Sequence, residues 1–159
     1  MDARINPAAA FGIKEGDAHV IRNAGGRASD DAIRSLIISH KLLGTKEWFV
    51  IHHTDCGMEY YTSSDMATLL EGSLSSVNIV AAPGTPKGVA FVNADSHGGC
   101  KDGHAIDWLT ITDQSASIKE DVAKIASHPL VGRGIPVHGY LYDVKTGAIG
   151  HVVSTVTRA

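Results

Sequence analysis

An apolar run at residues 47–53, EWFVIHH, constrains the fold of this chain more than any other segment. A run of strand length without polar alternation is typical of a strand that is buried on both faces of a parallel sheet. Parallel neighbours can be joined only by a crossover connection, which is usually a helix. The run therefore predicts an α/β protein in which helices flank a mostly parallel sheet.

Helix and strand signals before the run fit this fold class. Residues 18–23, AHVIRN, favour a short strand that leads into two glycines. Residues 29–44 favour a helix, with Ser29 or Asp30 as its N-cap and Gly44 just past its end. Strand, helix and apolar run together predict a βαβ unit with a right-handed crossover.

The last third of the chain carries similar signals. A capping box of Ser117 and Glu120 predicts a helix that stops before Pro129. Residues 136–144 and 148–156 then favour two strands around the turn KTG. We therefore expect a C-terminal hairpin at one edge of the sheet.

Composition indicates one globular domain across residues 1–159, at 43% hydrophobic and 19% charged. Within it, residues 73–106 are rich in Gly, Ser and Pro, and we expect a loop-rich insertion there. A net charge of −3 leaves no basic surface for nucleic acid, and no apolar run reaches the roughly 18 residues of a membrane span. We expect no signal peptide in MDARINP, and reduced thiols at Cys56 and Cys100, as in a cytoplasmic protein.

His53 and Cys56 stand at the carboxyl end of the apolar run, where open parallel sheets gather their ligands. Imidazole nitrogen and thiolate sulfur are usual ligands of zinc, and a three-residue spacing lets both reach one ion from a tight turn. The pair therefore indicates a zinc site. The spacing alone leaves a second interpretation open, in which His53 is a strand-end histidine and Cys56 a small buried apolar residue.

A series of short motifs runs along the chain: MDARI at the start, then GDAHVIRNAGG, DDAIRSL, HHTDCGM, HPL and GYLYDVKTG. In order and approximate spacing these motifs resemble the β-class carbonic anhydrases, a family that includes carbonyl sulfide and carbon disulfide hydrolases. The resemblance covers about residues 1–72 and 106–150. It implies the fold of that family, a zinc ion, and hydration or hydrolysis of a small linear electrophile.

The resemblance also assigns roles to particular residues. His53 and Cys56 match two ligands of the family's zinc ion, and Asp2 and Arg4 match an aspartate–arginine pair. Asp2 would then accept a hydrogen bond from zinc-bound water, or bind the zinc itself, while Arg4 keeps the Asp2 carboxylate ionised. The family's remaining ligand is a cysteine that would fall immediately before Met1.

The family's N-terminal arm, first strand and first ligand cysteine therefore have no counterpart in this sequence. We expect a chain that is cut short at its start, because a sheet without an inner strand leaves buried backbone groups unpaired at about 1–3 kcal/mol each. A partner chain that lends a strand, or a rebuilt site, is the alternative. Cys100, within SHGGCKDGH, is a candidate replacement ligand.

The resemblance implies that zinc-bound hydroxide converts carbon dioxide to bicarbonate, or carbonyl sulfide to carbon dioxide and hydrogen sulfide. Backbone amides of Ala24, Gly25 and Gly57 are candidates for binding the oxyanion. We expect a homodimer or a larger homo-oligomer. Two other functions stay open: a metal-poor family member that acts as a binding or regulatory subunit, and an unrelated α/β protein that binds phosphate at NAGG.

Overall fold

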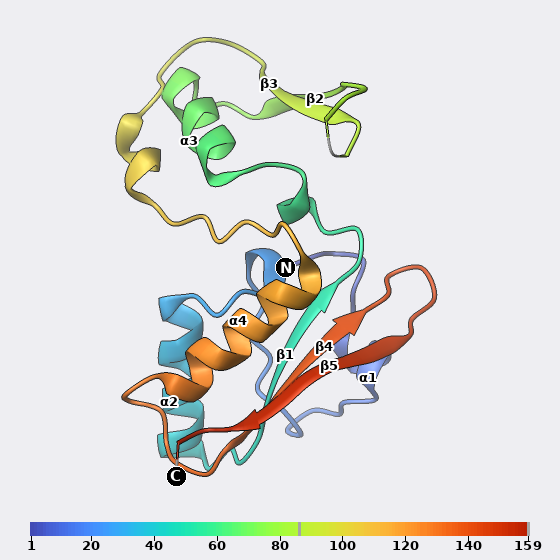
Figure 1. Ribbon diagram of the computed structural model, residues 1–159, viewed down its shortest axis with the longest axis vertical. Coiled ribbons are helices and arrows are strands. Elements are labelled where there is room, and N and C mark those ends of the chain that lie inside the picture. Colours follow the sequence, from blue (N-terminus) through green and yellow to red (C-terminus); the bar gives the residue numbers. More distant parts are fainter. Residues whose placement is uncertain (86, 159) are drawn as a thin grey trace. The chain divides into compact units, whose positions relative to one another are not determined.

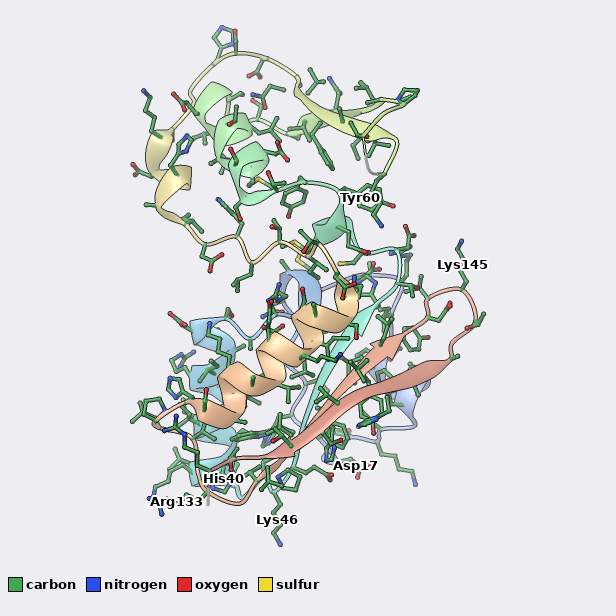
Figure 2. All side chains as sticks on the ribbon, viewed as in Figure 1. Asp17, His40, Lys46, Tyr60, Arg133 and Lys145 are labelled. Carbon is green, nitrogen blue, oxygen red and sulfur yellow. The ribbon has the colours of Figure 1, made fainter. Side chains whose placement is uncertain are left out.

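In the computed structural model, which describes residues 1–85 and 87–158, the apolar run forms strand β1 (Trp48–His53). β1 pairs in parallel with β4 (Pro136–Tyr142), and β4 pairs antiparallel with β5 (Ile149–Val156) (Figure 1). The predicted C-terminal hairpin is thus confirmed, and Lys145 at its turn points away from the strands (Figure 2). The sheet is mixed, however, because the antiparallel hairpin supplies one of its two described pairings, so the prediction of a mostly parallel sheet is wrong in this detail.

The described chain divides into two compact units. The first contains Met1–Asp55 and the segment from Asp113 onward, and the second contains Cys56–Thr112. The prediction of one domain across residues 1–159 concerns the whole chain and stays a prediction.

The helices of the first unit begin and end at residues that the local sequence explains. α2 has Ser29 as its N-cap and a left-handed Gly44 at its C-cap, as predicted. α4 begins before the predicted Ser117, because the Asp113 carboxylate accepts a hydrogen bond from the Ala116 N–H at 2.6 Å and caps the helix. The bounds are α1 (Pro7–Phe11), the 3-10 turn η1 (Ala24–Gly26), α2 (Asp30–Leu43) and α4 (Gln114–Ser127).

The predicted strand at residues 18–23 is wrong. These residues are described, and they form no strand. A strand is stable only when a neighbour satisfies its backbone groups, and within the described part of the chain β1 pairs with β4 alone. Val20 and Ile21, which the prediction would have packed inward, are 51% and 41% exposed.

The core of the first unit lies between one face of the sheet and the helices α2 and α4. Ile33 of α2 and Ile118 and Val122 of α4 pack there with Val50 and Val137 of the strands. Because α2 and α4 cover only this face, β1 alternates: Trp48 is 3% exposed and Phe49 is 54% exposed. The prediction that β1 is buried on both faces is therefore wrong.

A charged cluster lies inside this core. Asp121 of α4 accepts a hydrogen bond from Arg27 Nε at 2.8 Å, and its Oδ2 lies 3.0 Å from His52 Nε2. Burial alone would raise the pKa of Asp121, but the hydrogen bonds from His52 and Arg27 outweigh this effect and lower it. The carboxylate is thus held ionised between two partners, which is the condition for burying a charge.

The second unit has its own elements and its own small core. Cys56, Met58 and Ile111 form the core, with Tyr61 packed against it. The prediction that residues 73–106 are loop-rich missed a two-stranded antiparallel hairpin. The bounds are η2 (Gly57–Glu59), α3 (Ser63–Gly72), β2 (Val77–Ala81), β3 (Val89–Asn93) and η3 (Lys101–Ala105). Across residues 1–85 and 87–158, none of the helices combines the length and the apolar character that a bilayer crossing requires.

Gly139 of β4 leaves room for side chains of α4 and of the neighbouring strand β5 to pack closely against it. A Cβ atom at this position would clash with Ile118 and would lie 2.9 Å from Val153 Cγ1. We predict that Gly139→Ala lowers the free energy of unfolding by about 1–3 kcal/mol in urea denaturation, since the packed side chains must move. Gly150→Ala in β5 is the control: its nearest atom, Leu141 O, is 3.9 Å away, so the change should be within about 0.5 kcal/mol. Equal losses in the two variants would contradict this packing.

Candidate metal centre

The two histidines that end β1 point to opposite faces of the sheet, because successive side chains of a strand alternate. His52 faces the helices and is fully buried at 0% exposure. His53 faces the other side, where 12% of its side chain is exposed. Only His53 can therefore reach a ligand on the open face of the sheet.

The imidazole of His53 is oriented by its neighbours. Its Nδ1 lies 2.9 Å from the Thr54 carbonyl oxygen, which can only accept, so Nδ1 carries the proton. In the neutral ring Nε2 then carries the lone pair, and this atom lies 3.7 Å from Asp2 Oδ2. Histidines that bind metal almost always donate their second ring N–H to an oxygen in this way. A nitrogen and an oxygen ligand of one tetrahedral zinc ion lie ~3.4 Å apart, so Asp2 and His53 fit that ion.

The backbone beyond His53 is also fixed. Thr54 N–H donates to Tyr142 O at 2.9 Å and so continues the ladder between β1 and β4. Thr54 Oγ1 accepts a further hydrogen bond from Val144 N–H at 3.1 Å. The carbonyl that holds the His53 ring thus belongs to a residue anchored at both its amide and its side chain.

Arg4 joins Asp2 to the loop that follows β1. Its guanidinium donates to Asp2 Oδ2 at 2.6 Å, to Asp55 Oδ2 at 2.8 Å and to the Asp55 carbonyl at 2.9 Å. The hydrogen bonds from Arg4 hold the pKa of Asp2 well below its usual range, against the opposing effect of partial burial. The same pairs, first with Asp2 and then with Asp55, raise the pKa of Arg4. Asp2 is therefore ionised whenever the protein is folded near neutral pH.

Arg22 and Asp55 support the pair formed by Asp2 and Arg4. Arg22 donates to the carbonyl oxygens of Asp2 and Ile5, at 2.5 Å and 2.8 Å, and so fixes the loop between them. Asp55 adopts the left-handed conformation with φ 54°, which turns both its carbonyl and its carboxylate toward Arg4. A non-glycine residue in this region is uncommon, and here the ion pair with Arg4 accompanies the strain.

The remaining predicted ligand, Cys56, begins the second unit. It is 5% exposed, and its N–H donates to Glu59 Oε2 at 3.3 Å. Burial and the nearby Cys56 thiol group raise the pKa of Tyr61. Gly57 follows as the first residue of η2.

The predicted oxyanion-binding residues Ala24 and Gly25 belong to η1 in the first unit, where Gly25 is left-handed with φ 71°. A Cβ atom on the next residue, Gly26, would lie 2.8 Å from Ile51 O and 3.3 Å from His52 Cδ2. η1 therefore packs directly against the backbone of β1, next to its carboxyl end.

Polar groups around Cys100 pair with neighbouring carboxylates. His104 pairs with Glu71 at 2.9 Å, and His97 donates its N–H to Asp95 at 3.2 Å. Throughout residues 1–85 and 87–158, no group of three or more His, Cys, Asp or Glu side chains is gathered closely enough to hold a metal ion. Both cysteines are free thiols, as predicted.

Comparison with known proteins identifies the family. A family model described as carbonic anhydrase matches residues 1–149. β-carbonic anhydrase 1 of Mycobacterium tuberculosis strain H37Rv is 33% identical over 152 residues, which cover 96% of this chain and 77% of the relative. The chain belongs to the β-carbonic anhydrase family.

Other similar proteins show both branches of that family. A carbon disulfide hydrolase of Acidianus sp. strain A1-3 is 32% identical over 147 residues, covering 92% of this chain and 71% of the relative. The crystal structure of a carbonic anhydrase from Streptococcus mutans has a TM-score of 0.76 at 38% identity, covering 96% of this chain and 77% of that one. The predicted fold class is confirmed, and this β-carbonic anhydrase homologue is an enzyme of the lyase or hydrolase kind that performs carbon dioxide hydration or a related hydrolysis.

Sequence reasoning found only part of the support for the site. From its place between the two predicted ligands, Asp55 is expected to be a supporting or structural residue, but nothing in the spacing connects it with Arg4. Gln114, whose amide reaches the His53 carbonyl at 3.0 Å, lay outside the predicted helix because Ser117 was taken as its start. A correct N-cap at Asp113 would have placed Gln114 on the same helix as Asp121.

Removing the guanidinium group of Arg4 should raise the pKa of Asp2. In zinc-free Arg4→Met, we predict that the Asp2 carboxyl titrates close to the ordinary value of about 3.9, whereas in the unmodified chain it stays ionised well below that pH. The measurement is carbon-13 NMR of the carboxyl groups as a function of pH. Arg34→Met is the control, since Arg34 pairs with Asp31 at 2.8 Å on the exposed surface of α2. An Asp2 titration that is the same in the unmodified chain and in Arg4→Met would contradict the role of Arg4.

Proposed function

We propose that this enzyme hydrates carbon dioxide to bicarbonate, or hydrolyses carbonyl sulfide or carbon disulfide, at a zinc ion. The observation that carries the proposal is the orientation of His53. Its Nδ1 is paired with Thr54 O, and its Nε2 faces an aspartate that Arg4 keeps ionised. This arrangement presents Nε2 of the neutral ring to a ligand on the side of Asp2.

His53 is the proposed nitrogen donor to zinc and Cys56 the proposed sulfur donor, while Asp2 either accepts a hydrogen bond from the zinc-bound water or binds the zinc itself. The assignment of Cys56 is supported by its place three residues after His53 and by the match of HHTDCGM to the family. A bound zinc ion supplies a Lewis acid that lowers the pKa of a coordinated water to about 7. Burial of Cys56 among Met58 and Ile111 keeps its sulfur away from bulk solvent.

Asp2 and Arg4 are proposed to act as an orienting pair. The Asp2 carboxylate accepts a hydrogen bond from the attacking water and turns it toward the substrate. Arg4 prevents Asp2 from taking up a proton, since its hydrogen bonds lower the pKa of Asp2. Asp55 keeps Arg4 in place at 2.8 Å, so the pair does not depend on a single contact.

The product oxyanion is proposed to bind backbone N–H groups of Ala24, Gly25 and Gly57. The packing of η1 against Ile51 supports this for Ala24 and Gly25, because it holds their backbone beside the end of β1. For Gly57 the support is its position directly after Cys56. The substrate is a small, linear and largely apolar molecule, and the similar proteins include enzymes for both carbon dioxide and carbon disulfide.

The metal proposal predicts zinc content and its loss in two variants. The purified protein should contain close to one zinc per chain, and His53→Ala and Cys56→Ala should each lower both zinc content and turnover. We expect turnover to fall more than about 100-fold, beyond the loss that follows from disturbing an outer partner of the metal. Stopped-flow assays of carbon dioxide hydration and of sulfide release from carbonyl sulfide measure the two reactions.

The matched controls are Cys100→Ala and His151→Ala, which change the same residue types elsewhere and should leave zinc content and turnover unchanged. A loss of zinc in Cys100→Ala would assign the sulfur ligand to Cys100 instead. A protein with less than about a tenth of an equivalent of zinc and no turnover would contradict the proposal and favour a binding or regulatory subunit.

We also propose that the enzyme is a cytoplasmic homodimer or larger homo-oligomer. The free thiols of Cys56 and Cys100 suit a reducing compartment. The register of the sheet puts Phe49, Ile149 and Val156 on the face opposite α4, where they are 54%, 45% and 57% exposed. Apolar side chains that share an exposed face indicate a contact surface.

Light scattering after size exclusion is expected to give a mass of at least two chains. Phe49→Glu should shift the mass toward one chain, because a carboxylate on that face opposes its burial. Thr155→Glu on β5, whose side chain lies on the other face, is the control. A monomeric mass for the unmodified protein would contradict the oligomer.

A further inference from the structure

Gln114 contacts two consecutive residues at the end of β1. It is the first residue of α4, and its Nε2 donates to the His53 carbonyl at 3.0 Å. Its Oε1 lies 3.2 Å from His52 Nδ1. One side-chain amide therefore joins the start of the helix to both histidines, through the backbone of one and the ring of the other.

The orientation of this amide follows from its partners. The His53 carbonyl oxygen can only accept a hydrogen bond, so the NH₂ group of Gln114 must face it. The Oε1 atom is then directed at His52. A flipped amide would set two oxygens against each other and leave the His53 carbonyl without this donor.

Gln114 is held in turn by the buried charged cluster. His52 lies between Gln114 and Asp121, whose Oδ2 is 3.0 Å from His52 Nε2 and 2.8 Å from Arg27 Nε. Gln114 and Asp121 are seven residues apart on α4, which places them on one face of the helix two turns apart. With His52 at 0%, Asp121 at 2% and Arg27 at 6% exposure, water cannot compete for these bonds.

We propose that Gln114 is a positioning residue for the metal centre. By fixing the backbone at His53, it fixes the direction of the imidazole and keeps Nε2 toward Asp2 and the proposed zinc. This inference rests on the proposed function. It adds a helix-borne support on one side of β1 to the ladder bond between Thr54 and Tyr142 on the other.

The test compares Gln114→Met, which keeps the volume and removes both hydrogen bonds, with Lys119→Met at an exposed position of the same helix. Zinc affinity is measured by competition with a chelator, and cobalt(II) absorption reports the geometry of the metal. We expect zinc affinity 10–100-fold weaker in Gln114→Met, as for other outer partners of metal ligands, with altered cobalt bands. Lys119→Met should match the unmodified chain in both.

A second readout does not need the metal. Nitrogen-15 NMR of the zinc-free protein gives the tautomer of His53, which should be protonated at Nδ1 in the unmodified chain and mixed in Gln114→Met. If Gln114→Met does not fold, Gln114→Asn replaces it. The Asn side chain keeps the polar amide but is too short to make the hydrogen bonds with His52 and His53.

The outcomes separate the two proposals. Normal zinc binding in the unmodified chain, with affinity within twofold and the same cobalt bands in the variant, would overturn the role of Gln114 and leave the proposed function intact. An unmodified chain that binds no zinc would overturn the proposed function. In that case the His53 tautomer tests the positioning role of Gln114. A tautomer that changes in Gln114→Met supports this role, and an unchanged tautomer overturns it.

Discussion

The parallel pairing of β1 with β4 determines where chemistry can occur in this protein. The register brings His53 opposite Tyr142, the last residue of β4, and the Thr54 amide extends the ladder beyond it at 2.9 Å. The pleat of the strand then gives its two histidines different surroundings. His52 enters the core beneath α4, while His53 faces the open side of the sheet with its Nε2 toward Asp2.

Two groups of charged residues lie on the two sides of the carboxyl end of β1, and they have different effects. Arg27, Asp121 and His52 are shielded from water, so removing one partner would leave a buried charge, at a cost of about 3–5 kcal/mol. Arg4, Asp2 and Asp55 are partly exposed, and pairs of that kind contribute little to stability. Their effect is on orientation and ionisation, which suits a site where a carboxylate must stay charged beside an imidazole.

The sequence predicts correctly those helices and strands whose signals are local. The Ser29 cap and the left-handed Gly44 define α2, and the apolar run defines β1, because short-range contacts decide both. Sequence reasoning failed for residues 18–23, since a strand needs a neighbour that no local pattern reveals. It also named Asp2, Arg4 and His53 through the family motifs, which the fold brings together. The contacts of Asp55 with Arg4 and of Gln114 with His53 span 51 and 61 residues of chain, so the sequence marks Asp55 only by its place beside the ligands and does not mark Gln114.

X-ray absorption at the zinc edge tests most directly whether an imidazole and a thiolate hold the proposed zinc ion. The protein loaded with one equivalent of zinc should show four-coordinate metal with sulfur at about 2.3 Å and nitrogen or oxygen at about 2.0–2.2 Å. A spectrum fitted by light atoms alone, with no sulfur shell, would contradict the assignment of Cys56 and the metal centre built on it.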